Sequence, residues 1–252
     1  MPDDIPVLAA DGISVNFGGL NALDQVSMSV PGGQIVGLIG PNGAGKTTMF
    51  NVLTGLQTTT TGRVSFKGSD ISGWPTHRRG RAGIARTFQR LALFTRLSVQ
   101  DNLVASWESS HAGGVFGRGR QQRQEKVRAV LELLDLEALA PRLAGELSTG
   151  QGRMVELGRA LCTDPSVLLL DEPGSGLDVV ETAAFSQVLR TVVALPERPG
   201  ILLVEHDMAL VMDVCSAITV LDFGSVIANG TPREIRADSL VRAAYLGDAS
   251  VA

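Results

Sequence analysis

Apolar and polar residues follow two different patterns along this chain. Strict alternation over residues 13–17 and 26–30 predicts strands with one exposed face. Short, mostly apolar runs over 34–39, 167–170 and 201–204 predict strands that are buried on both faces. Strands of the second kind are typical of parallel sheets covered by helices, so the pattern indicates an α/β fold.

Helices are expected between and after the buried strands. The first should begin near Lys46 and end at Gly55, and two more should cover 179–195 and 207–215. Thr231 followed directly by proline is typical of a helix start, which predicts short helices near the C-terminal end.

The middle of the chain lacks this alternation. No convincing strand is found from about residue 91 to 164, and apolar residues over 127–134 fall on one helical face. A glycine-rich loop is expected over 111–120. We therefore expect one domain in which a helical subdomain interrupts an α/β core. The domain covers 1–252, the core 1–90 and 166–252, and the subdomain 91–165.

Composition and charge argue against several classes of protein. Hydrophobic residues make up 44% of the 252 residues, and the net charge of −4 argues against a nucleic-acid partner. No unbroken apolar run is longer than 208–212, so we expect no transmembrane helix. The acidic first residues do not resemble a signal peptide, which predicts a cytoplasmic protein. Cys162 and Cys215 lie in unrelated contexts and predict neither a disulfide framework nor a zinc site.

Residues 40–47 read GPNGAGKT and match the pattern G-x-x-x-x-G-K-[ST]. Glycines let backbone N–H groups turn toward phosphate oxygens, and the following helix adds its positive dipole end. Lys46 should reach the β- and γ-phosphates, while the Thr47 hydroxyl can ligate Mg²⁺. The pattern predicts a nucleoside triphosphate site but leaves many families open. The expected contacts are Asn42, Gly43, Ala44, Gly45, Lys46, Thr47 and Thr48.

Two acids follow the buried run at 167–170. At the carboxyl edge of a parallel sheet, Asp171 would hold Mg²⁺, and Glu172 would orient or deprotonate the attacking water. General-base catalysis of this kind contributes typically about 10²–10⁴ in rate. Taken alone, the pair fits a strand end with solvated acids equally well.

Two further motifs and three single residues identify a family by resemblance. LSTGQ at 147–151 resembles the LSGGQ signature of ABC-type ATPases, and SGLD at 175–178 resembles their D-loop. Gln89 is similar to their Q-loop glutamine, His206 to their switch histidine, and Phe17 to the aromatic that stacks on adenine. All these motifs occur in family order over nearly the whole chain.

The resemblance implies an α/β P-loop NTPase of ABC type, with a RecA-like core, an antiparallel β subdomain and an inserted helical subdomain. It further implies that Gln89, Glu172 and His206 act in hydrolysis and that Gln89 joins Thr47 and Asp171 at the metal. ATP and Mg²⁺ are the implied ligands. A further set of implied nucleotide contacts is Ser148, Gly150 and Gln151 of the signature.

The chain holds one phosphate loop and one signature. In the family that it resembles, two domains pair head to tail, and the signature of one closes over the γ-phosphate bound to the other. The resemblance therefore implies a second ABC ATPase subunit, either identical or a paralogue. The signature region departs from the family pattern at several positions, which are Thr149, Gly152, Met154 and Gly174.

Shorter matches point to a subfamily. Residues 84–89 and 97–99 and the ending AYLG at 244–247 resemble ATPases for bacterial uptake of branched-chain and other hydrophobic amino acids. Relatives for urea or amide uptake and for lipopolysaccharide export share much of this sequence. Soluble ABC ATPases of DNA repair, translation or iron–sulfur assembly are the rival class. The stretch between the phosphate loop and the signature has room only for a small helical subdomain, which favours a transporter subunit.

A transporter ATPase without a membrane span needs membrane partners. The resemblance implies two integral permease subunits, an extracytoplasmic substrate-binding protein, and a position on the inner face of the bacterial plasma membrane. The candidate docking surface after Gln89 could instead be subdomain core, and its residues are Leu91, Leu93, Phe94 and Leu97. A set of arginines in the expected loop could contact anionic lipid or form a solvated patch, and these are Arg118, Arg120 and Arg123.

Overall fold

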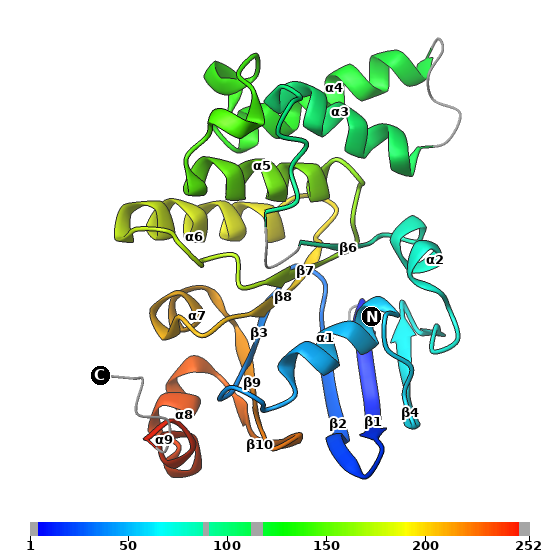
Figure 1. The fold of residues 1–252 in the computed structure, drawn as a ribbon, viewed down its shortest axis with the longest axis vertical. Coiled ribbons are helices and arrows are strands. Elements are labelled where there is room, and N and C mark those ends of the chain that lie inside the picture. Colours follow the sequence, from blue (N-terminus) through cyan, green and yellow to red (C-terminus); the bar gives the residue numbers. More distant parts are fainter. Residues whose placement is uncertain (1–4, 88–90, 112–117, 247–252) are drawn as a thin grey trace.

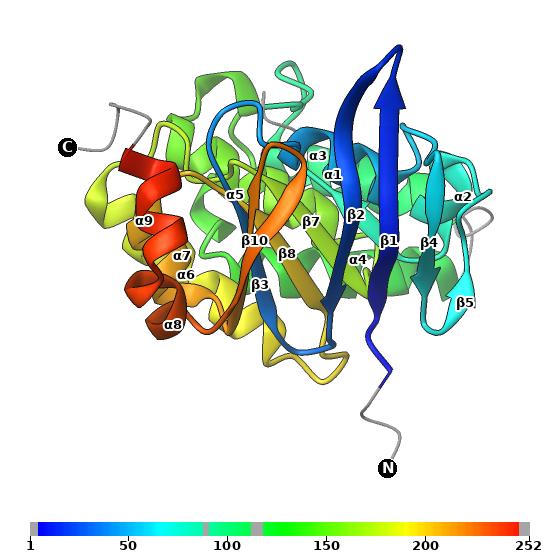
Figure 2. The same ribbon diagram turned by 90° about the horizontal axis from the view of Figure 1, so that it is seen from below.

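The computed structural model describes residues 5–87, 91–111 and 118–246, in which helices pack around one β-sheet and a second β-sheet lies at one side (Figure 1). Gln89 lies outside the described residues. The first sheet has the strand order β2-β1-β4-β5, all antiparallel, and Figure 2 shows β1, β2 and β4 side by side. Its strands are β1 (Leu8–Phe17), β2 (Leu20–Val30), β4 (Thr61–Phe66) and β5 (Ser69–Asp70).

The second sheet has the order β10-β9-β3-β8-β7-β6. Strands β9, β3, β8, β7 and β6 run parallel, and β10 pairs antiparallel with β9. The parallel strands confirm the α/β fold that the buried apolar runs predict. The strands are β3 (Ile35–Ile39), β6 (Ile84–Arg86), β7 (Val167–Asp171), β8 (Gly200–Val204), β9 (Ala217–Asp222) and β10 (Ser225–Gly230).

Helices cover both faces of the parallel sheet, with α5, α6 and α7 on one face and α1 on the other. The helices α3, α4 and α5 lie at one end of the molecule, away from the antiparallel sheet (Figure 1). The α-helices are α1 (Lys46–Thr54), α2 (Thr76–Arg81), α3 (Val99–Ser110), α4 (Arg118–Leu133), α5 (Thr149–Leu161), α6 (Val179–Val193), α7 (Met208–Val214), α8 (Pro232–Ala237) and α9 (Ser239–Leu246). Two 3₁₀ turns lie at Glu137–Leu139 and Ala144–Glu146.

Alternate side chains of β3 enter two different hydrophobic cores. Ile35 and Ile39 pack with residues of α5, α6 and α7 on one face. Val36 and Leu38 pack with α1 and with the antiparallel sheet on the other face. Burial on both faces explains why this strand has no polar positions between its apolar ones.

One expected loop is partly helical. Helix α4 already begins at Arg118, so the three arginines at 118, 120 and 123 lie on a helix and not in a loop. Polar contacts support its first turns, because Arg123 pairs with Glu108 of α3 and Gln121 donates to Glu125 at 2.8 Å. Apolar periodicity misses a helix start that polar contacts stabilise.

The hairpin of β9 and β10 is a second feature that the apolar pattern does not predict. It lies between α7 and the start of α8, which Thr231 caps as expected by accepting the Glu234 N–H. None of the described helices is long and apolar enough to cross a membrane.

Candidate active site

Three neighbouring strands bring the predicted functional segments to one edge of the parallel sheet. Leu38 of β3 pairs with Val204 of β8, and Val204 pairs with Asp171 of β7. The phosphate loop, the two acids and His206 directly follow these three strands. Because parallel strands end at the same edge, the topology places all three segments side by side.

A cleft of about 660 Å³ opens at this edge, between the phosphate loop and the turn that joins β1 to β2. All the predicted phosphate-loop residues line it, together with Phe17 and Glu172. Phe17 is 49% exposed. The remaining lining residues, which sequence reasoning did not single out, are Leu20, Asn21, Ala22 and Phe223.

The loop backbone turns sharply before α1. Gly45 has φ 105°, and a Cβ at this position would lie 2.7 Å from the carbonyl oxygen of Ala22, so only glycine fits. Lys46 Nζ donates to the carbonyl oxygens of Gly40 and Pro41, at 2.5 and 2.9 Å. These bonds hold the ammonium group against the loop, where it can meet a phosphate.

The two acids after β7 occupy different environments. Burial raises the pKa of Asp171, and so does the Glu172 charge, while Arg86, Arg153 and Lys46 act in the opposite direction. Glu172 lines the cleft and adopts a left-handed backbone with φ 47°. A strained backbone of this kind is concentrated at functional sites.

Glu172 and His206 lie close together although they follow different strands. Oε1 of Glu172 is 3.7 Å from Nδ1 of His206, and the Glu172 N–H donates to the Val204 carbonyl at 2.8 Å. His206 is not among the residues that line the cleft. The structure therefore places His206 beside the acid and not in the wall that the nucleotide would touch.

The oxygen donors at this edge fit a magnesium ion. Thr47 offers a hydroxyl from the cleft wall and Asp171 a carboxylate from the end of β7. Mg²⁺ prefers oxygen ligands, and a cation would stabilise the carboxylate of Asp171, whose pKa is raised by burial and, to a lesser degree, by the charge of Glu172.

Glu205 is a buried acid that sequence reasoning missed. It is 1% exposed and accepts N–H groups from Gly174 at 2.6 Å and from His206 at 3.1 Å. Burial raises its pKa, and the amides of Gly174, Asp207 and His206 oppose the rise. The carboxylate thus ties the segment after β7 to the segment after β8. An acid directly before His206, at the end of a buried strand, is the signal that could have revealed it.

Glu205 also explains why glycine occupies position 174, where this chain departs from the family pattern. A Cβ at Gly174 would lie 2.8 Å from Oε1 of Glu205, so a side chain there would displace the carboxylate. The glycine leaves room for the bond between its own N–H and that oxygen.

The signature residues lie elsewhere. Ser148 caps α5 and forms a capping box with Gln151. Neither residue lines the cleft, and nor does Gly150. Helix α5 packs on one face of the parallel sheet and α1 on the other, so one chain does not bring the two motifs together (Figure 1).

Contacts with the D-loop explain two signature positions. The Thr149 methyl group lies 3.1 Å from where a Cβ of Gly176 would be, and Gly176 has φ 83°. A Cβ at Gly150 would overlap the Glu181 carboxylate. The threonine that departs from the family pattern therefore lies beside the D-loop, while a side chain at position 150 would displace the Glu181 carboxylate.

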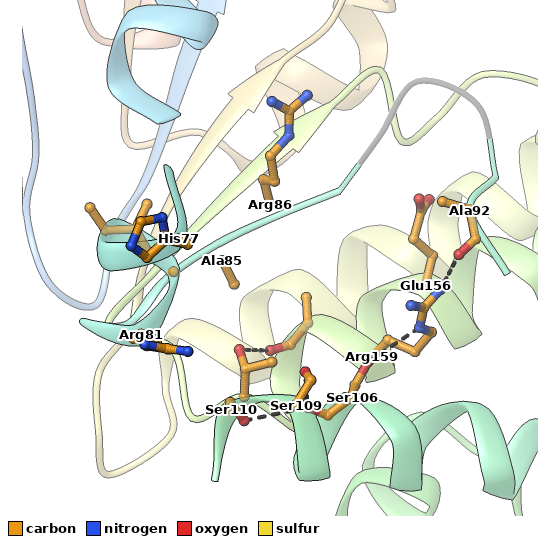
Figure 3. A pocket seen from close by; sticks show the side chains of 14 residues that line it. His77, Arg81, Ala85, Arg86, Ala92, Ser106, Ser109, Ser110, Glu156 and Arg159 are labelled. Carbon is orange, nitrogen blue, oxygen red and sulfur yellow. Dashed lines mark hydrogen bonds between the residues drawn. The ribbon is translucent and has the colours of Figure 1, made fainter. Parts of the chain in front are cut away.

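A second hollow of about 390 Å³ lies between α2, β6, α3 and α5 (Figure 3). Arg159 points along its wall toward Ala92, donates to the Ala92 carbonyl and to Ser106 Oγ, and lies over the ring of Phe94 at 4.8 Å. Of the predicted docking residues, three are exposed and Leu93 packs against the core. The exposed ones are Leu91, Phe94 and Leu97, at 39%, 51% and 38%.

Comparison with known proteins identifies the family. Residues 23–175, more than half of the chain, match the ABC transporter family. The high-affinity branched-chain amino acid transport ATP-binding protein BraF of Pseudomonas aeruginosa is 38% identical, and the alignment covers 97% of this chain and 99% of BraF. The chain belongs to the ABC transporter ATP-binding family. Its members are ATPases, so this ABC subunit hydrolyses ATP to power a transporter.

Other relatives agree with this assignment. LptB, the lipopolysaccharide export system ATP-binding protein of Haemophilus influenzae, is 35% identical over 96% of this ABC subunit and 98% of LptB. The crystal structure of the ADP conformation of MJ1267, an ATP-binding cassette, superposes with a TM-score of 0.83 at 32% identity, covering 96% of this chain and 98% of MJ1267. Residues 225–251 match the branched-chain amino acid ATP-binding cassette transporter family.

Proposed function

We propose that this subunit powers the uptake of branched-chain amino acids and that ATP binds in the cleft. The observation that carries the proposal is the single cleft that joins the phosphate loop, Phe17 and Glu172. The substrate class is supported by the BraF alignment and by the match of residues 225–251.

Each residue of the cleft has a role in this proposal. Amide groups of the phosphate loop and Lys46 bind the phosphates, and Phe17 stacks on adenine. Thr47 and Asp171 hold Mg²⁺, with Gln89 as the third contact that the family resemblance implies, and the ion neutralises phosphate charge when it is bound. Glu172 accepts a proton from the attacking water, and His206, which lies beside Glu172 and outside the cleft wall, acts in hydrolysis as the family resemblance implies.

The signature requires a second ABC ATPase subunit. Since Ser148 and its neighbours lie away from the cleft of their own chain, they serve the nucleotide of a partner that packs head to tail. The partner is a second copy or a paralogue.

The permease subunits dock at the exposed side chains of Leu91, Phe94 and Leu97, next to the hollow of Figure 3. Its lining includes Arg159 of α5, which contacts Ala92 and Phe94 beside the exposed leucines. The same helix begins at the signature. A permease segment that moves residues 91–97 would therefore move the signature. In this proposal the subunit lies on the inner face of the plasma membrane, and a substrate-binding protein acts on the outer side.

Transport assays in a strain that lacks the gene test the substrate class. We expect uptake of labelled leucine to be lost and to return with the wild-type gene but not with the Lys46→Ala variant. Unchanged leucine uptake would contradict the proposal.

The LptB alignment supports lipopolysaccharide export as the second candidate. A loss of lipopolysaccharide from the outer surface, with leucine uptake intact, would favour it. A loss of urea or amide uptake alone would assign the subunit to that related class of importer.

A further inference from the structure

Phe223 combines two features that rarely occur together on an aromatic residue. Its side chain is 89% exposed, and its backbone has φ 42°, in the left-handed region. Bulky side chains avoid this region, where glycine and asparagine are the ordinary occupants. The two-residue loop of the β9–β10 hairpin requires this backbone, because both central residues of such a turn have a positive φ, and Gly224 has φ 80°.

The turn that carries Phe223 is fixed to the phosphate loop. It joins β9 to β10, and the Gly224 N–H donates to the Ala44 carbonyl at 3.0 Å. The Asp24 N–H of β2 donates to the Gly224 carbonyl at 2.8 Å. A Cβ at Gly224 would lie 2.9 Å from the Ala22 carbonyl oxygen, so glycine lets the turn approach β2 closely.

These bonds connect three elements around one cleft. The turn of β1 and β2 contributes Phe17 and Leu20, the loop contributes the phosphate-binding amides, and the turn of β9 and β10 contributes Phe223. Phe17 and Leu20 are also exposed, at 49% and 68%. Beyond the phosphate loop, the cleft therefore has an apolar rim with two aromatic rings, which suits the flat base of a nucleotide.

We propose that Phe223 packs on the purine base of the nucleotide, as a second aromatic contact beside Phe17. The inference rests on the proposed ATP site in this cleft. Binding would cover a ring that otherwise faces solvent, and this gain offsets the cost of its left-handed backbone. The contact adds affinity for the base but none for the phosphates.

Binding of two ligands to the full-length protein tests this assignment. MgATP carries a base, whereas magnesium tripolyphosphate presents a similar chain of phosphates without one. The test variant is Phe223→Asn, because asparagine tolerates the left-handed backbone. Phe223→Trp keeps an aromatic ring, and Val226→Asn removes an exposed apolar side chain of β10 that does not line the cleft.

We expect the dissociation constant of ATP to rise about 5- to 150-fold in Phe223→Asn, the range for loss of one base–aromatic contact. Tripolyphosphate affinity should not change. Phe223→Trp and Val226→Asn should bind both ligands as the wild type does. The melting temperature of Phe223→Asn should equal or exceed that of the wild type, since the strain is relieved.

Two results would overturn the inference. Wild-type ATP affinity in Phe223→Asn would show that the ring does not contact the base. An equal loss for both ligands would show that Phe223 acts through the phosphate loop. The Lys46→Ala variant separates this from the wider proposal, because an unchanged ATP affinity in it would place the nucleotide outside this cleft.

Discussion

Two helices begin at the phosphate-related motifs, and their first turns are built differently. Helix α1 follows Gly45, whose left-handed backbone offers no side chain to cap the first amide groups. Helix α5 follows Ser148, whose hydroxyl accepts the Gln151 N–H while the Gln151 side chain accepts the Ser148 N–H. The first turn of α1 is therefore open to an anion, whereas that of α5 is already occupied by its own side chains.

The two helix starts also differ in the residues that surround them. Lys46, Glu172 and Phe17 surround the start of α1 in one cleft, and no lining residue of that cleft comes from the start of α5. We conclude that the α1 side gathers its parts within one chain. In the proposed function, the α5 side serves the nucleotide of a second chain.

The largest effect should follow from Glu172→Gln, which changes only the α1 side. Turnover should fall by about 10²- to 10⁴-fold, because the amide cannot accept a proton from water, while ATP binding remains. Steady-state ATPase assays measure this. Glu197→Gln changes an exposed glutamate and should hydrolyse normally. Normal hydrolysis by Glu172→Gln would refute its role as the base.

Lys46→Ala tests the open helix start directly. Loss of the only ammonium in the cleft wall should weaken ATP binding by about 30-fold or more, as is typical for truncation of one member of a buried charge pair. Titration calorimetry provides the measurement. Lys67→Ala, on the β4–β5 turn, removes an exposed lysine and is the matched control. Equal affinities of the two variants would remove Lys46 from the site.

Ser148→Ala opens the capping box of α5 and tests the other side. Its matched control is Thr231→Ala, which opens an equivalent box at α8. Each change should lower the free energy of unfolding by about 1 kcal/mol. Only Ser148→Ala should weaken ATP-dependent pairing of the Glu172→Gln protein, as measured by analytical ultracentrifugation. ATP binding to the single chain should stay at the wild-type level. Weaker binding there would show that the signature serves its own cleft.

The smallest effect concerns Tyr245 of α9, the only tyrosine of the chain, near the Gly40 amide. Burial raises its pKa to about 12, and the Gly40 amide opposes the rise. Because the unfolded value is about 10, the buried neutral phenol contributes its full stability below pH 10. That contribution is lost as the pH rises from 10 through 12. Tyrosinate absorbance in the folded protein should show the high pKa, and a midpoint near 10 would contradict the burial of the phenol.

Local patterns in the sequence were sufficient for the strands β3, β7 and β8 and for the start of α1. Continuous apolar runs and a glycine-rich loop leave few alternatives for such segments. The start of α4 was missed, since polar contacts with Glu108 and within the helix stabilise it and apolar spacing does not. The hairpin of β9 and β10 was missed too, and with it Phe223.

Some functional residues belong to a recognisable motif, whereas others can be understood only from their contacts in the folded chain. Lys46 and Glu172 belong to patterns with few chemical interpretations, whereas Glu205 gains its meaning only from the amides that surround it. Its place after a buried strand and before His206 could have singled it out, but its bond to Gly174 does not follow from neighbouring residues, because Gly174 is distant in the sequence.

By itself the sequence determined that this chain is an ABC ATPase, since the phosphate loop, signature and acidic strand end need particular residues at particular spacings. Only the tertiary structure decided which of them meet. Strand register joins the ends of β3, β7 and β8 and places Glu172 beside His206, and the sheet keeps α1 and α5 on opposite faces. The physical reason is that motif chemistry is local, whereas contact between distant segments depends on how the strands pair and pack.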